Sequence, residues 1–228
     1  YFGALIAVFG GFLAMKYLKE STIEKVKIEK SSLKFYDKRI FPFLFGWCIA
    51  FLVFTGTQVI AAFFIEDRLG VIGQNEIIKA TSIALLSMAL TTTLMQAVVL
   101  QIFNISFQTL LRICFVIFGT VLLSITLVQD LWHLYLAFSG IGIAFSMMTP
   151  GLNAGATLSV EAHEQGEVAG LLAAAPVLGM IFGPPLGAFL YNLDTTYPFY
   201  YGGIVVLMLG VYFQFIKFPK DIHSKLDA

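Results

Sequence analysis

The sequence predicts an all-α membrane protein, and two observations lead to this prediction. Of the 228 residues, 58% are hydrophobic and only 12% are charged, whereas about a quarter of the residues in a typical soluble domain are charged. The apolar residues form long unbroken runs, such as "SIALLSMALTTTLMQAVVL", and a helix needs about 20 such residues to cross a bilayer. A transmembrane β-barrel would show alternating polarity instead. Helical spans are therefore expected.

The chain contains six full-length candidate spans and one shorter apolar run. The short run covers residues 1–15, lacks both a positively charged start and a cleavage site, and so does not resemble a signal peptide. Because it does not begin with Met and is too short to cross untilted, we expect a fragment that starts at the end of a preceding helix. The six long spans are expected at 41–65, 78–101, 107–128, 131–159, 167–191 and 198–218.

A basic stretch between the short run and the first long span indicates the orientation of the chain. It runs from Lys16 to Arg39 and holds eight of the 14 Lys and Arg residues, and cytoplasmic loops accumulate such residues. With this linker inside, alternation puts 12 basic residues inside and two outside. We expect a cytoplasmic linker at 16–40, a six-helix bundle at 41–218 and a cytoplasmic tail at 219–228. A specific lipid or protein site in the linker is the alternative.

The spans differ in the polar residues that they carry. The lone cysteines Cys48 and Cys114 are expected to act as small apolar residues, not as a disulfide. The substrate side is expected to come from the spans 41–65, 78–101, 131–159 and 167–191. The candidates for lining a cavity are Phe54, Gln58, Thr92, Gln96, Phe145, Met148 and Asn153. For Ser and Thr, a hydrogen bond to their own helix carbonyl is the alternative.

The span 167–191 combines an apolar run with residues that disfavour helices. Glycines every four residues would let a neighbouring backbone approach closely, and prolines remove backbone donors. The helix-packing set is Gly170, Gly179, Gly183, Pro184 and Gly187. We expect Gly183→Leu to be damaging, and Gly187→Ala to be mild because Ala188 is already accepted beside it.

The spacing in this set resembles the antiporter motif G-x8-G-x3-G-P-x2-G-G of drug:proton antiporters in the major facilitator superfamily, with Ala188 in place of the last Gly. The turn before it, with Glu164, Gly166 and Gly170, is similar to the acidic turn of that drug-efflux branch. The family motif belongs to the fifth helix, and the layout here suggests its repeat in the eleventh. The Gly-Asp-Arg-rich loop of the family is missing, with Arg112 alone at the equivalent place.

This resemblance implies the carboxy-terminal six-helix half of a twelve-helix major facilitator fold, plus part of the preceding helix. It implies proton-driven efflux of amphipathic drugs by alternating access, in a bacterial inner membrane, together with an amino-terminal half. The spans carry no ionisable residue at their centres, so we expect the proton-coupling acid in that other half. A nutrient symporter of the same superfamily and a non-transporting membrane scaffold remain alternatives. Since nucleophile motifs and metal-ligand spacing are missing, no enzyme, cofactor, metal or nucleic-acid partner is expected.

Overall fold

The structure is a computed structural model that describes residues 8, 11–12, 33–99 and 105–216. The chain divides into two compact units, Tyr1–Ser31 and Ser32–Ala228. Of the first unit the structure describes Val8, Gly11 and Phe12, so the span predicted at 1–15 and most of the linker predicted at 16–40 lie outside the described residues. The fold and the sites below belong to the second unit.

The second unit is built from six long helices, and the described residues contain no strand. All six are long and apolar enough to cross a membrane. They are α2 (Phe41–Asp67), α3 (Gln74–Leu94), α5 (Phe107–Ile125), α6 (Leu131–Leu158), α7 (Gln165–Leu193) and α8 (Tyr197–Phe215); α3 continues as the short π-helix η1 (Met95–Val99), and the 3₁₀ turn η2 (Ala162–Glu164) precedes α7. The predicted all-α membrane fold is thereby confirmed.

Local chemistry explains where several of these helices begin. Gly70 and Gly73 have φ values of 65° and 101°, which favour glycine, and the turn that they form lets α3 start at Gln74 instead of the predicted residue 78. Asp130 caps α6 by accepting a hydrogen bond of 2.9 Å from the backbone N–H of His133. The α5 helix ends at Ile125, three residues before the predicted limit.

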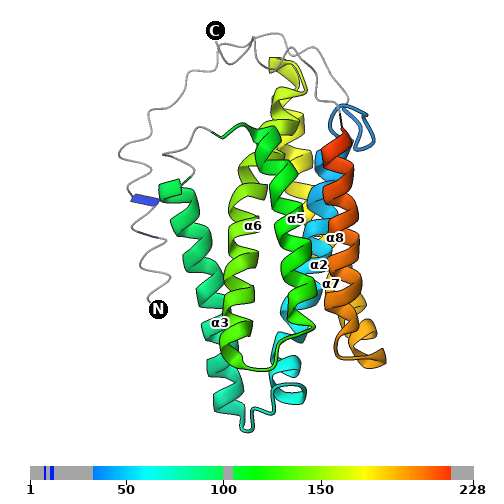
Figure 1. The fold of residues 1–228 in the computed structure, drawn as a ribbon. Helices are drawn as coiled ribbons and strands as arrows, with labels where there is room; N and C mark the ends of the chain where they lie inside the picture. Colours follow the sequence, from blue (N-terminus) through cyan, green and yellow to red (C-terminus); the bar gives the residue numbers. More distant parts are fainter. Residues whose placement is uncertain (1–7, 9–10, 13–32, 100–104, 217–228) are drawn as a thin grey trace. The chain divides into compact units, whose positions relative to one another are not determined.

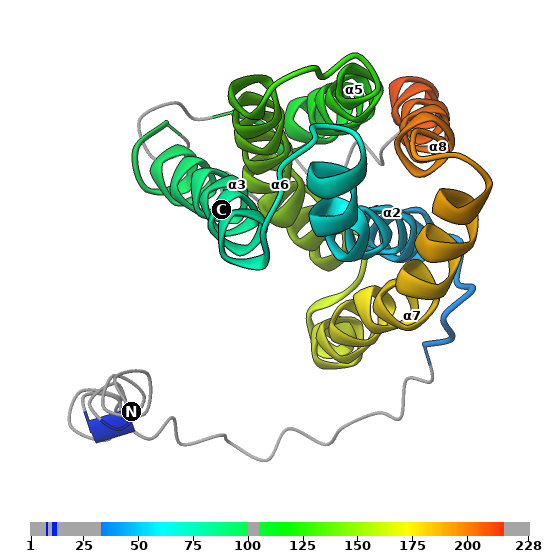
Figure 2. The ribbon, with the colours of Figure 1, turned by 90° about the horizontal axis from the view of Figure 1, so that it is seen from below.

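The helices run side by side along one common axis, and helices that follow one another in the chain run in opposite directions (Figure 1). Seen along the bundle, α2 lies between α6, α7 and α8, while α5 packs against α6 and α8 (Figure 2). α3 packs mainly against α6, and α7 mainly against α2. Consequently α3 and α7 bury few side chains, whereas α2, α5, α6 and α8 form the core.

Hydrogen bonds at the helix ends fit this up-and-down order. At one end Tyr191 Oη donates to Asp67 Oδ2 over 2.8 Å, which joins the end of α7 to the end of α2. At the opposite end Gln214 Nε2 donates to the backbone oxygen of Arg112 over 2.8 Å, which joins the end of α8 to the start of α5. Aromatic rings fill the core between these ends; Phe115 and Phe213, for example, stack with centroids 5.0 Å apart.

Candidate functional site

A face made of aromatic and polar side chains runs along the contact between α2 and α6; we call it the aromatic face and define it by Trp47, Phe51, Phe54, Phe145 and Asn153. On α2 the first three recur at spacings of four and three residues, which puts them on one side of the helix. Phe145 of α6 lies between the α2 rings, with centroids 5.7 Å from Phe51 and 4.8 Å from Phe54. Phe51 and Phe54 remain partly exposed.

One polar pair ends the aromatic face on the side where α2 begins. Trp47 Nε1 donates a hydrogen bond of 3.1 Å to Asn153 Oδ1, so the indole is fixed across the helix pair. Asn153 is nevertheless exposed, while Trp47 is buried. An Asn amide also carries two N–H donors. The face therefore combines flat apolar surfaces with one hydrogen-bonding amide and has no fixed charge.

The structure brings together three of the seven residues predicted to line a cavity and separates the other four. Phe54, Phe145 and Asn153 belong to the aromatic face. Gln58 is exposed one helical turn beyond Phe54, and Gln96 is exposed in the π-helix η1. Thr92 bridges two helices, and Met148 is wholly buried inside the bundle.

Most of the intramembrane Ser and Thr hydroxyls bond their own helix. Thr92 Oγ1, for example, lies 2.9 Å from the Met88 oxygen and 3.1 Å from the Gly142 oxygen, which ties α3 to α6. The same local pattern holds for Thr55, Thr91, Thr93, Ser139, Ser146 and Thr149. These hydroxyls thus donate to backbone carbonyls. The Thr57 hydroxyl differs, because it has no hydrogen-bond partner among the described residues.

Glycines make the contact between α7 and α2 unusually close. A Cβ atom at Gly179 would meet the Cys48 oxygen, and one at Gly183 would meet Thr55 Oγ1 and the Leu52 oxygen. Gly170 lies outside this contact, since a Cβ there would meet nothing within 4 Å. Pro184 follows Gly183 within α7, which stays helical from Gln165 to Leu193.

Gly187 corrects one expectation drawn from the sequence. A Cβ atom there would lie 2.7 Å from both the Cα and the carbonyl oxygen of Gly56. Backbone atoms cannot turn aside as a side chain does, so Gly187→Ala is not mild in this structure. The presence of alanine at position 188 does not predict the effect of alanine at position 187, because Ala188 is exposed while Gly187 is buried against α2.

An ion-pair cluster joins the start of α2 to the start of α7. The two terminal nitrogens of Arg39 each donate a hydrogen bond of 2.9 Å to a different carboxylate oxygen of Glu164. Arg39 also forms an ion pair with Asp37 at 3.0 Å. The hydrogen bonds that Arg39 donates to Glu164 and Asp37 raise the pKa of Arg39 and lower the pKa of Asp37. Glu164 is largely buried and also accepts a hydrogen bond from the Glu161 backbone. We call Asp37, Arg39 and Glu164 the Arg39 clamp.

Sequence reasoning missed several residues that these contacts use. Trp47 and Phe51 share a helix side with Phe54 and Gln58, so their spacing along α2 was a usable signal. Gly56 is the backbone partner of Gly183 and Gly187, but a lone glycine on another helix gave no sign of that pairing. The Arg39 clamp joins residues 125 positions apart, and a single sequence carries no signal for such a contact.

The fold and these contacts define a class: an integral, multi-pass membrane protein whose six helices pack through glycines and enclose no charged centre in the described spans. Residues 46–227 match the Major Facilitator Superfamily. Because this match covers most of the sequence, the chain belongs to that family, which comprises transporters rather than enzymes. Its six helices correspond to half of the family's fold.

Two curated relatives come from Bacillus subtilis (strain 168). The chain is 25% identical to Multidrug resistance protein 1 over 238 aligned residues, which cover 100% of this chain and 58% of that protein. It is 38% identical to Multidrug resistance protein 2 over 66 residues, which cover 29% of this chain and 16% of that protein. The chain thus spans little more than half the length of the first relative.

Proposed function

We propose that this chain forms the carboxy-terminal half of a transporter that exports small amphipathic molecules by alternating access. The observation that carries the proposal is the aromatic face, where the partly exposed rings of Phe51 and Phe54 on α2 pack against the buried Phe145 ring of α6 and share one face with the Asn153 amide, without a fixed charge. Such a surface suits flat, apolar molecules with few hydrogen-bonding groups. The family match and the names of the two relatives support the same substrate class.

A second six-helix half is part of this proposal. Among the described helices, α3 buries only Ala80 and Ala84, and α7 leaves large apolar side chains such as Val177 and Ile181 exposed. The chain also covers 58% of its longer relative. Because family members are built as two repeated halves around a midplane site, an amino-terminal half against α3 and α7 would complete the substrate cavity, to which Gln58 and Gln96 would then contribute.

Proton coupling is proposed to depend on that other half. Every charged side chain in the described helices lies within six residues of a helix end, whereas a proton relay needs an ionisable group inside the membrane. In this proposal the carboxy-terminal half supplies substrate contacts and moving helices, and the amino-terminal half supplies the acid. A fixed anionic substrate would call for an intramembrane Arg or Lys, and the described spans offer none at their centres.

The proposal also places the chain in a bacterial inner membrane with the linker at 16–40 and the tail at 219–228 in the cytoplasm. The distribution of basic residues supports this orientation, because 12 of the 14 Lys and Arg residues fall on one side. The Arg39 clamp agrees with it, since it joins the end of the linker to the turn before α7, and alternation puts both on the cytoplasmic side.

The test is export of the fluorescent dye Hoechst 33342 by the intact transporter at matched expression. Phe54→Ala and Asn153→Ala should each lower the apparent affinity for the dye about five- to thirtyfold, because each removes one contact worth about 1–2 kcal/mol. Phe45→Ala is the matched control, since Phe45 is an exposed aromatic residue on the same helix outside the aromatic face. Equal dye affinity in all three variants would contradict the proposed site, and dye uptake instead of export would favour a symporter.

A further inference from the structure

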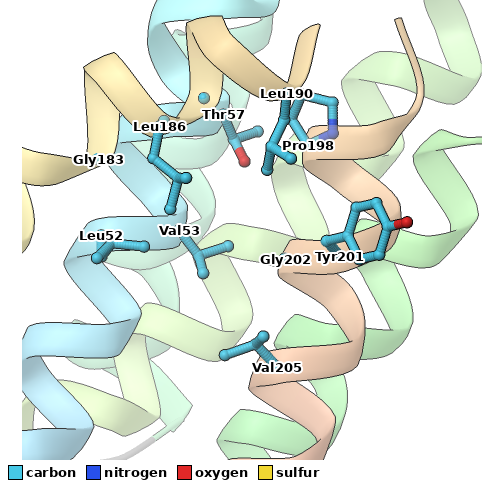
Figure 3. A pocket seen from close by; sticks show the side chains of 12 residues that line it. Leu52, Val53, Thr57, Gly183, Leu186, Leu190, Pro198, Tyr201, Gly202 and Val205 are labelled. Atoms are coloured by element: carbon cyan, nitrogen blue, oxygen red, sulfur yellow. The ribbon is translucent and has the colours of Figure 1, made fainter. Parts of the chain in front are cut away.

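A pocket opens between α7 and α8, and α2 forms its floor. Its volume is about 80 Å³, enough for several methylene-sized groups, because one water-sized sphere needs about 10–15 Å³. The described residues that line it are Leu52, Val53, Gly56, Thr57, Gly183, Leu186, Gly187, Leu190, Pro198, Tyr201, Gly202 and Val205. Figure 3 shows side chains of the three helices converging on this space.

The pocket lies away from the aromatic face. In an α-helix successive residues turn by about 100°, so Val53 and Gly56 point to the side of α2 opposite Phe54 and Phe51. The lining residues come from α2, α7 and α8, and α6 contributes none. A molecule in this pocket would therefore not occupy the proposed substrate site, and the inference does not rest on the proposed function.

Thr57 has a buried hydroxyl group that finds no partner among the described residues. Its side chain is 2% exposed. Thr55, two residues earlier, bonds the Phe51 oxygen at 2.7 Å, whereas the Thr57 hydroxyl turns toward the lining of the pocket (Figure 3). A buried polar group without a hydrogen bond is rare and unfavourable, so this oxygen points to a ligand that supplies the missing partner.

The lining indicates what kind of ligand fits. A buried water needs two to four polar partners, but the lining side chains are apolar apart from Thr57 and Tyr201, and the Tyr201 hydroxyl points away from the pocket (Figure 3). Thr57 is the seventeenth of the 27 residues of α2, close to the middle of the helix, which is too deep for the headgroup or ester region of an ordinary lipid.

We propose that this pocket binds a slender, neutral, lipophilic molecule with a single hydrogen-bonding group, of the class of a long-chain alcohol. Its apolar chain enters from the bilayer between α7 and α8, where Leu186, Tyr201 and Val205 are each about two-fifths exposed. Its hydroxyl group bonds Thr57 Oγ1, which can both donate and accept. The bound molecule lies beside Gly183 and Gly187, where α7 contacts α2 most closely.

The test uses 3-azioctanol, an eight-carbon alcohol with a photoreactive diazirine, on the full chain in lipid nanodiscs. After irradiation, labelled residues are mapped by mass spectrometry. Labelling should concentrate on the pocket residues of α2, α7 and α8, and excess octanol should suppress it far more than excess octane. Thr57→Val should raise the octanol concentration needed for suppression about three- to tenfold, as expected for one lost hydrogen bond.

Two further variants keep the outcome clear. Thr55→Val is the matched control and should leave labelling unchanged, because the Thr55 hydroxyl already bonds backbone oxygens. Val205→Trp should abolish labelling by filling the open side of the pocket. Equal octanol competition in Thr57→Val and the unsubstituted chain would overturn the proposal. So would a marked fall in the unfolding temperature of Thr57→Val without octanol, because that would reveal a partner for the hydroxyl within the protein.

Discussion

At the contact between α2 and α7, the surroundings of one Cβ atom decide which glycine substitutions the bundle tolerates. Gly179, Gly183 and Gly187 face backbone atoms of α2, so an added methyl group meets atoms that cannot rotate away. Gly170 belongs to the same sequence motif but has open space around it. The motif therefore contains residues with different structural roles, and its spacing alone does not separate them.

The first prediction compares three alanine substitutions along α7. Gly183→Ala and Gly187→Ala should each lower the free energy of unfolding by about 1–3 kcal/mol, the usual range for overpacking. Gly170→Ala should leave stability unchanged or raise it by up to about 1 kcal/mol, because Ala favours the helix more than Gly does. Denaturant unfolding of the purified chain in detergent measures all three. Similar values for Gly187→Ala and Gly170→Ala would show that the close approach to Gly56 does not exist.

At the scale of helices, hydropathy predicted the number of spans and most of their limits, because a bilayer demands about 20 apolar residues per helix. The glycine spacing predicted a close packing surface on the span 167–191. Neither signal identifies the helix that packs against this surface. The contact of Gly187 with Gly56, and therefore the effect of Gly187→Ala, could not be predicted from the sequence. Likewise Thr55 and Thr57 look alike in the sequence, and only the packing of α7 and α8 distinguishes their hydroxyls.

The second prediction concerns the Arg39 clamp, which links the starts of α2 and α7. Glu164→Gln removes the charge that two Arg39 nitrogens approach at 2.9 Å. The Glu164 side chain is largely buried, while that of Arg39 is 44% exposed. Glu164→Gln should therefore lower the free energy of unfolding by about 1–2 kcal/mol, between the values for surface and buried ion pairs. Thermal unfolding in detergent measures it, and the double exchange Arg39→Glu with Glu164→Arg should restore part of the stability.

Lys79→Gln is the control for this experiment, since Lys79 and Glu76 are exposed and 4.0 Å apart, and it should change stability little. The clamp also has a pH dependence of definite sign. Hydrogen bonds from Arg39 lower the pKa of Asp37. The contribution of Asp37 to the stability of the fold is therefore complete above the ordinary Asp pKa of about 3.9 and is lost as the pH falls below that value. A loss of clamp stability between pH 8 and 6 would contradict this assignment.

At the scale of the whole molecule, the two sites lie on opposite sides of α2. The aromatic face joins α2 to α6, whereas the pocket near Thr57 joins α2 to α7 and α8. A movement of α2 relative to α6 would therefore change the aromatic face, and a movement of α2 relative to α7 or α8 would change the pocket. The glycine contact and the Arg39 clamp hold α2 and α7 together at mid-helix and at one end, so we expect α2 and α7 to move as one unit.

The last prediction tests the orientation of that unit in the membrane. In a chain whose Cys48 and Cys114 are replaced by alanine, single cysteines at Tyr36 and at Gln74 would report on opposite ends of the bundle, because both positions are exposed and α2 lies between them. In intact cells a membrane-impermeant maleimide should label Gln74→Cys and spare Tyr36→Cys. Opening the cells should make Tyr36→Cys reactive. If only Tyr36→Cys were labelled in intact cells, the chain would have the opposite orientation, and the Arg39 clamp would lie outside the cytoplasm.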